Sequence, residues 1–190
     1  MPSARTHDRI TLWSLPVVAG VTFTLTRSSS HTLLVAGGFL FGGLMFGPDL
    51  DIYSQHYRRW GWLRWIWIPY QKSIRHRSIL SHGPFLGSAL RVLYLGCCLT
   101  ALGFLGVGIS QIIWGFPWNW QQFVLQMRRA LVSYQSECIA VYIGLEIGAI
   151  SHSISDIVSS AYKRLQSSKK RANKKSDRRH RSPPSRIKSK

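Results

Sequence analysis

The sequence has 190 residues, of which 45% are hydrophobic and 17% are charged, and its formal net charge is +18. Residues 163–190 hold 13 of the 25 lysines and arginines and a single acid, so most of the basic excess belongs to the end of the chain. The three cysteines, Cys97, Cys98 and Cys138, form no CxxC pair. This pattern argues against a disulfide framework and a thiolate zinc site, and it is typical of small buried hydrophobes.

Four apolar segments follow one another along the chain: Leu12–Thr26, Thr32–Phe46, Val92–Ile113 and Phe123–Ile150. A helix needs about 20 apolar residues to cross a bilayer, and the third segment meets that length unaided. The first two are short, so they cross only with flanking residues or in a thin bilayer, or they form a re-entrant hairpin. We predict an all-α membrane domain over residues 1–162, a bundle of about four apolar helices.

Tryptophan and basic residues indicate how the bundle is oriented. The tryptophans flank the third segment, as amphipathic rings do at a bilayer surface: Trp60, Trp62, Trp65, Trp67, Trp114, Trp118 and Trp120. Lysine and arginine concentrate at the N-terminus, in residues 52–83 and in the tail, and basic loops stay on the cytoplasmic side. We expect four crossings with both termini cytoplasmic and the Arg128–Arg129 pair on the other side.

The basic tail, residues 163–190, carries Lys, Arg, Ser and two prolines and has almost no large apolar side chains. It cannot bury enough apolar surface to offset the entropy of ordering, so we predict that it is disordered. Such a tract is suited to anionic lipid headgroups or to nucleic-acid phosphates, or it serves only as a solvated determinant of topology. The sequence sets no oligomeric state.

Histidines and aspartates lie at the ends of the four apolar segments. The predicted topology places all of these ends at one membrane face, where a bundle would bring the side chains together. We expect a metal centre there, drawn from these residues: His7, Asp8, Asp49, Asp51, His76, His82, His152 and Asp156.

Two local patterns support metal binding. His152 and Asp156 are four residues apart, which puts them on one face of a helix. Asp49 and Asp51 follow Pro48, and an extended turn there would direct both carboxylates to one side. Imidazole and carboxylate ligands without thiolate suit Zn, Mn or Fe. Because the candidates exceed the needs of one ion, some would support the ligands or the centre would hold two metals.

Within this set, the predicted roles differ. The metal ligands would be taken from His7, Asp49, Asp51, His76, His82, His152 and Asp156. The proton acceptor of a catalytic site would be Asp51, Asp8 or Asp156.

Three further polar residues are assigned separately. His31 falls at the opposite face and is predicted to be an interfacial polar residue, whereas the pattern assigns no role to His56. Glu146 would lie inside the membrane, where a carboxylate is costly and usually functional.

These motifs also resemble a known group. The sequence over about residues 5–160 looks like an uncharacterised, mainly cyanobacterial family of metal-binding integral membrane proteins, which is similar in turn to the YdjM-like membrane-bound metal-dependent hydrolases. The resemblance implies a divalent metal, location in the plasma or thylakoid membrane of a bacterium and, less directly, hydrolysis. It rests on His7-Asp8-Arg9-Ile10, Gly47-Pro48-Asp49-Leu50-Asp51, His76-Arg77-Ser78-Ile79-Leu80-Ser81-His82 and His152-Ser153-Ile154-Ser155-Asp156.

Three functions are compatible with these patterns. The first is a metal-dependent hydrolase acting near the lipid headgroups, on a phospholipid or acyl lipid. The second is a non-catalytic anchor or adaptor whose metal stabilises the bundle while the tail binds a partner. The third is a transporter that uses Glu146. A serine hydrolase is disfavoured because the chain has no GxSxG motif.

Overall fold

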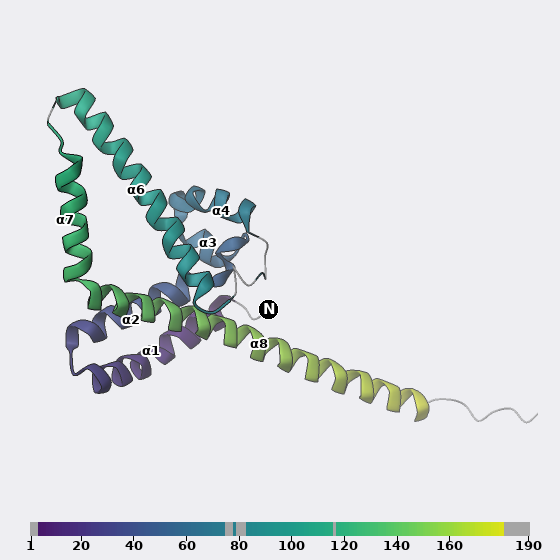
Figure 1. The fold of residues 1–190 in the computed structure, drawn as a ribbon. Helices are drawn as coiled ribbons and strands as arrows, with labels where there is room; N and C mark the ends of the chain where they lie inside the picture. The colour runs from purple at the N-terminus through teal and green to yellow at the C-terminus, as the bar shows by residue number, and fades with distance from the viewer. Residues whose placement is uncertain (1–3, 75–77, 79–82, 116, 181–190) are drawn as a thin grey trace, which may run out of the picture.

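The computed structural model describes residues 4–74, 78, 83–115 and 117–180, and this part of the chain is helical with no strand. Five long helices and four short ones follow in order (Figure 1): α1 Ala4–Thr26, α2 Ser29–Leu44, η1 Pro48–Asp51, α3 Gln55–Arg59, η2 Gly61–Trp67, α4 Ile68–Ser73, α6 Leu86–Trp114, α7 Trp120–Ser133 and α8 Gln135–His180. The all-α prediction is confirmed.

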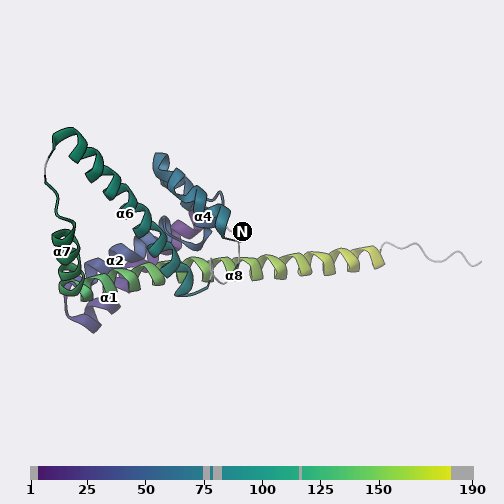
Figure 2. The same ribbon diagram turned by 45° about the horizontal axis from the view of Figure 1, so that its top comes forward.

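Helices α1 and α2 form a tight hairpin that lies along the first half of α8 (Figures 1 and 2). Arg27 ends α1 with a positive φ of 51°, and the Ser28 side chain caps α2 by accepting a hydrogen bond from the His31 amide at 3.3 Å. Helix α6 then diverges from α8, and α7 leads back to the start of α8. The hairpin therefore places the start of α1 and the end of α2 at the same end of the packed helices.

Glycines allow α2 and α8 to pack backbone against backbone. Gly38 and Gly42 on α2 face Gly144 and Gly148 on α8, and each pair has the four-residue spacing of a GxxxG motif. A Cβ on Gly144 would lie 2.2 Å from the Val35 carbonyl oxygen. No side chain fits there, so the glycine pairs set the separation of the two helices.

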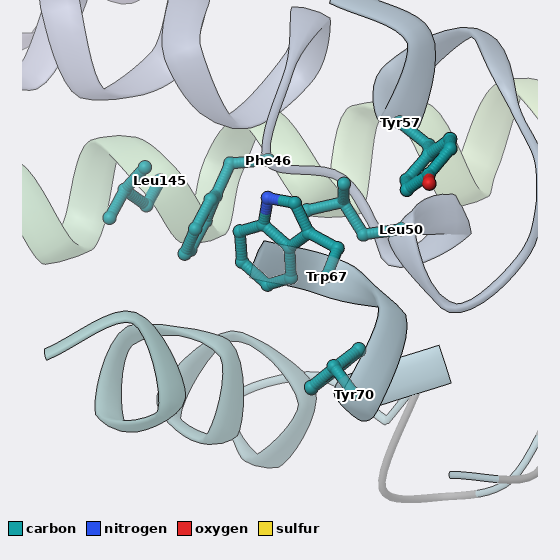
Figure 3. Close-up of a cluster of buried hydrophobic side chains, with 6 residues drawn as sticks. All are labelled: Phe46, Leu50, Tyr57, Trp67, Tyr70 and Leu145. Atoms are coloured by element: carbon teal, nitrogen blue, oxygen red, sulfur yellow. The ribbon is translucent and has the colours of Figure 1, made fainter. Parts of the chain in front are cut away.

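A buried aromatic cluster packs the short helices against α6 and α8. Trp67 of η2 lies at its centre and is fully buried, with Phe46 and Leu50 beside it (Figure 3). Tyr70 of α4 packs edge-on against Trp67, with ring centroids 5.5 Å apart. This cluster fixes the turn that follows α2, including η1.

Helix α6 is attached to α8 by polar contacts at its first residues. Phe85 adopts a positive φ of 64°, a strained conformation for a bulky residue. Its amide donates to Glu146 Oε1 at 2.8 Å, and its carbonyl oxygen accepts from the Tyr142 hydroxyl at 2.9 Å. These two bonds stabilise the strained residue and fix the point at which α6 leaves α8.

A buried arginine lies nearly two turns further along α6. Arg91 donates to Ser88 Oγ at 2.9 Å, and its guanidinium lies 5.9 Å from the centre of the Phe46 ring. A buried charge needs such polar and aromatic partners. Arg91 therefore links α6 to the aromatic cluster.

The structure refines the predicted apolar segments. By length and composition, three helices within the described residues are able to cross a membrane: Thr6–Thr26, Leu86–Trp114 and Gln135–Ser168. Helix α2 is shorter, with 16 residues. Helix α1 begins at Ala4, well before the predicted start at Leu12. The polar residues in its first turns lower the average hydropathy, so hydropathy does not reveal that part of the helix.

The predicted fourth segment, residues 123–150, is wrong in its extent. A turn at Tyr134 separates α7 from α8, so one apolar stretch forms two helices of different direction. Average hydropathy reports composition and does not detect a change in direction.

The structure also differs from the sequence prediction at the start of the basic tail. Helix α8 continues through residues 163–180, where disorder was predicted. Lys, Arg, Gln and Ala are good helix formers, and neither glycine nor proline interrupts the chain between Gly148 and Pro183. Hydrogen bonding within one helix needs no tertiary contact, so a chain that buries little apolar surface can still be helical.

The glycine contact makes a testable prediction. Gly144→Ala should destabilise the protein by about 1–3 kcal/mol, because its Cβ would overlap the α2 backbone. Gly37→Ala is the matched control: no heavy atom lies within 4 Å of its added Cβ, so stability should stay equal or rise by up to about 1 kcal/mol. Thermal unfolding of the detergent-purified variants measures both, and equal midpoints would contradict the packing described.

Candidate metal centre

Three distant segments bring histidine and aspartate together at one end of the packed helices. His7 comes from the start of α1, Asp49 from η1, and His152 and Asp156 from α8. His152 Nε2 lies 3.3 Å from Asp49 Oδ2 and 3.6 Å from Asp156 Oδ2. His7 Nε2 lies 3.2 Å from Asp156 Oδ1. One ligand atom from each of His7, His152 and Asp156 falls within 4.8 Å of the other two.

Local sequence explains why each side chain points inward. On α8, the four-residue spacing places His152 and Asp156 one turn apart on the same face. On α1, Thr11 packs against Gly43 of α2. A Cβ added to Gly43 would lie 2.8 Å from the Thr11 methyl carbon. This close approach brings the first turns of α1, with His7, against α2 and α8.

Ser155 fixes the orientation of the His7 ring. The Ser155 hydroxyl donates its one proton to the backbone, with the Ser151 carbonyl oxygen 2.9 Å away and the His152 carbonyl oxygen 3.2 Å away. Its oxygen is therefore available to accept from His7 Nδ1–H at 3.2 Å. In the neutral ring this leaves a lone pair on Nε2, the nitrogen that faces Asp156. Metal-binding histidines are commonly oriented in this way.

The electrostatics of this arrangement suit a proton or a metal ion between His7 and Asp156. In the neutral His7 ring, the Nε2 lone pair faces a carboxylate oxygen 3.2 Å away, and two acceptors at that distance repel unless a proton or a metal ion lies between them. His7 and His152 are 7% and 6% exposed, with ring centroids 4.3 Å apart. His152 Nδ1 is buried without a hydrogen-bond partner among the described residues. The donor set thus fits a divalent ion.

His56 is a member of the site to which the sequence assigned no role. Its ring lies 4.6 Å from that of His152, centroid to centroid, and it lines the same cavity. Burial, aided by the neighbouring His152, lowers the pKa of His56 to about 3, which keeps the imidazole in the neutral form that metals bind. Gly47 makes room for it, since an added Cβ would lie 2.3 Å from His56 Cε1. In the sequence, the Gly47-Pro48 turn was the feature that could have indicated space for a side chain such as His56.

Asp8 lines the cavity but is held by an arginine. Arg59 Nη2 donates to Asp8 Oδ2 at 2.5 Å, and Arg59 Nη1 donates to the Leu44 carbonyl oxygen at 2.7 Å. The pair joins α1, α2 and α3 at the edge of the cavity. It also places a guanidinium beside the histidines.

Asp51 is directed away from the cavity. The extended turn expected after Pro48 is instead the 3₁₀ helix η1, whose three residues per turn point residues i and i+2 in different directions. The expectation that both carboxylates share one side is therefore wrong. Asp51 is buried on the Tyr70 side: burial raises the pKa of the Tyr70 hydroxyl, Arg91 partly offsets that shift, and Asp51 adds to it.

The remaining predicted residues fall in other places. His76 and His82 lie outside the described residues. His31 lies at the α1–α2 turn, where its Nδ1 is 3.0 Å from Ser28 Oγ, at the other end of the hairpin from His7. Glu146 is buried, and its Oε1 accepts from the Phe85 amide, which places this carboxylate at the start of α6.

The histidines and aspartates line a cavity of about 230 Å³ that is open on one side. Its wall combines the site residues with polar and aromatic side chains of the turn after η1: His7, Asp8, Asp49, Ile52, Tyr53, Ser54, Gln55, His56, Arg59, His152 and Asp156. The cavity is large enough to hold an ion with a small molecule beside it.

Comparison with known proteins agrees with this chemistry. Residues 2–166 match the family described as "Uncharacterized metal-binding protein (DUF2227)". The chain belongs to this family. Among curated proteins, an "Uncharacterized protein" of Aquifex aeolicus (strain VF5) is 41% identical over 59 residues, which cover 30% of this chain and 41% of that protein. The chain thus matches less than half the length of this relative, and no solved structure matches.

The family's metal fits the residues present. His7, His152 and Asp156 provide two imidazoles and a carboxylate within reach of one ion, and Asp49 adds a second carboxylate. Hard and borderline ligands of this kind, without thiolate, suit Zn, Mn or Fe. The metal-binding character predicted from the sequence is confirmed at the level of the family, and the identity of the metal stays a prediction.

Ser155 provides a test of how the site is built. Ser155→Ala should weaken divalent metal affinity about 10- to 100-fold, because the His7 ring loses the acceptor that orients it. Ser153→Ala is the control: on the same helix, the Ser153 hydroxyl bonds the Ala149 carbonyl oxygen at 3.1 Å. Titration against a chromophoric chelator measures the affinities. Equal weakening in the two variants would contradict the assigned role of Ser155.

Proposed function

We propose that this family member is a membrane-embedded metal-dependent hydrolase. The observation that supports it is the open cavity beside a His/Asp cluster: a purely structural metal is normally enclosed by its ligands, whereas a catalytic one keeps an accessible position. The ion would be held by His7, Asp49, His152 and Asp156. When bound, it would supply Lewis acidity and a water activated at neutral pH.

Asp8 and Arg59 suit the remaining steps of hydrolysis. An anionic substrate group would bind the Arg59 guanidinium and release Asp8 from its ion pair. Asp8 would then take a proton from water as the water oxygen attacks the ester. It would return that proton to the leaving alcohol, so that ester and water become acid and alcohol. Of the three predicted proton acceptors, Asp8 is preferred because Asp51 points away and Asp156 contacts two histidines.

A lipid substrate is supported by a second, apolar groove between α1 and α8. This groove has a volume of about 430 Å³ and includes Ile10, Val18, Phe39 and Ile150 in its lining. It also includes Ser155, the residue that bonds His7. An acyl chain in the groove would place its ester near the ligand atoms. The substrate class proposed is therefore a phospholipid or acyl lipid.

We also propose the membrane arrangement expected from the sequence. Two of the helices able to cross a membrane, Thr6–Thr26 and Gln135–Ser168, contribute ligands, and His7 lies at the very start of the first. The centre would then lie at the headgroup level. Basic residues favour the cytoplasmic side for this face, with both termini there.

A metal-stabilised anchor or adaptor is the competing function. Ligands from three distant segments would crosslink the bundle, so metal would stabilise the fold in either case. Two measurements distinguish the hydrolase from the adaptor: hydrolytic activity, and the effect of deleting residues 163–190. If that deletion abolishes the cellular role while the metal is retained, the adaptor is supported. Transport through Glu146 is less supported, since this carboxylate holds the start of α6.

Metal content tests the centre itself. Purified in detergent and saturated with divalent metal, the protein should hold metal at about one ion or more per chain by mass spectrometry. His152→Ala should lose most of it, because His152 contacts both Asp49 and Asp156. His31→Ala, a histidine at the other end of the hairpin, should keep it. Retention of metal by His152→Ala would overturn the assigned ligands.

Activity tests the catalytic assignment. The metal-loaded protein should hydrolyse phospholipids or acyl esters, and Asp8→Asn should lower kcat about 10²- to 10⁴-fold with metal content unchanged. Glu137→Gln, which alters an exposed carboxylate at the start of α8, should leave kcat unchanged. If the metal-loaded wild-type protein hydrolyses neither phospholipids nor acyl esters, the adaptor becomes the better-supported function.

A further inference from the structure

Helix α7 is an amphipathic helix with no buried residue. Its apolar side chains gather on one face, since residues three and four apart share a side of a helix: Trp120, Phe123, Val124, Met127 and Leu131. Glutamine and arginine occupy much of the remaining surface. An isolated helix of 14 residues is marginally stable in water, so α7 needs a surface that covers its apolar face.

The position of α7 points to a membrane surface. It leads into the start of α8 and runs crosswise to it in both views (Figures 1 and 2), at the opposite end of the hairpin from the metal centre. From Gln135 to His152, α8 rises about 26 Å at ~1.5 Å per residue. A bilayer's hydrocarbon core is about 30 Å thick. If the metal centre lies at one headgroup level, α7 lies at the other.

The charge of α7 fits anionic headgroups. Arg128 and Arg129 form no ion pair with any residue that the structure describes, and the sequence has no acid between Asp51 and Glu137. Leu125, Val132 and Ser133 join the two arginines around a shallow groove of about 330 Å³. Guanidinium groups bind phosphate with paired hydrogen bonds, and apolar neighbours suit the start of an acyl chain.

Aromatic residues at the start of α7 support the same placement. Trp118 and Trp120 lie with ring centroids 5.6 Å apart, and Trp120 lies 4.7 Å from Phe104 of α6. Asn119 caps α7, its Oδ1 accepting from the Gln122 amide at 3.0 Å. Tryptophan prefers the boundary between headgroups and hydrocarbon. The cap and the aromatic contacts hold α7 in its crosswise direction.

We propose that α7 is an interfacial helix that binds anionic phospholipid headgroups through Arg128 and Arg129, in the leaflet opposite the metal centre. The inference rests on the proposed membrane arrangement and not on hydrolysis. Anionic lipid would hold α7 at the membrane surface, and so fix the far end of the bundle.

The test uses the full chain purified in detergent. Native mass spectrometry should show phosphatidylglycerol retained in preference to phosphatidylcholine, and phosphatidylglycerol should raise Tm more. The variant R128Q/R129Q should lose both preferences. The control R58Q/R64Q removes two charges from α3 and η2, near the metal end, and should keep them.

Four outcomes overturn the proposal in distinguishable ways. Full release of the wild-type protein from membranes by alkaline carbonate would remove the membrane arrangement itself. An integral protein without lipid preference, or an R128Q/R129Q variant that keeps the preference, would overturn the role of α7 alone. A dimer that dissociates in R128Q/R129Q, without lipid dependence, would assign the surface to a second copy of the chain.

Discussion

Close packing of the α2 and α8 backbones is the constraint on which the rest of the structure depends. Four glycines remove the side chains that would otherwise separate the helices, and van der Waals contact and shape then hold them together. Because the η1 turn follows directly from α2, this contact sets where Asp49 lies relative to His152. A separation larger by one side chain would move these two side chains too far apart to share an ion. The geometry of the candidate site therefore depends on the uncharged glycine contact between α2 and α8.

Around this contact the polar side chains fall into two groups, one that lines the cavity and one that is buried in the helix packing. His7, Asp49, His152 and Asp156 converge on an open cavity, whereas Asp51 and Arg91 are buried in the packing around the aromatic cluster and Glu146 fixes the start of α6. The two groups are connected by η1, which carries Asp49 toward one side and Asp51 toward the other. Few acids are present, and the described ones are mostly committed to specific contacts. A small number of acids, each with a partner, is expected where an unpaired buried charge would cost roughly several kcal/mol of stability.

The proposed functions share a dependence on the two ends of the bundle. At one end, an open His/Asp cluster beside an apolar groove favours chemistry on a lipid. At the other, α7 presents arginines and an apolar face. The distance between the ends is close to the thickness of a bilayer core. A single membrane placement therefore accounts for both surfaces, although each is tested by a different measurement.

Composition and hydropathy predicted the helical class, and the positions of histidine and aspartate predicted part of the candidate site. Hydropathy gave the apolar segments, and the positions of histidine and aspartate at their ends predicted that His7, Asp49, His152 and Asp156 would meet, as they do. Three features follow from packing in three dimensions and not from the sequence pattern: Asp51 turns away, His56 joins the cavity, and the fourth segment divides at Tyr134. The reason is physical: spacing along the chain reports which face of an element a residue occupies. The direction of a short turn, and the neighbour that covers it, depend on packing between distant segments.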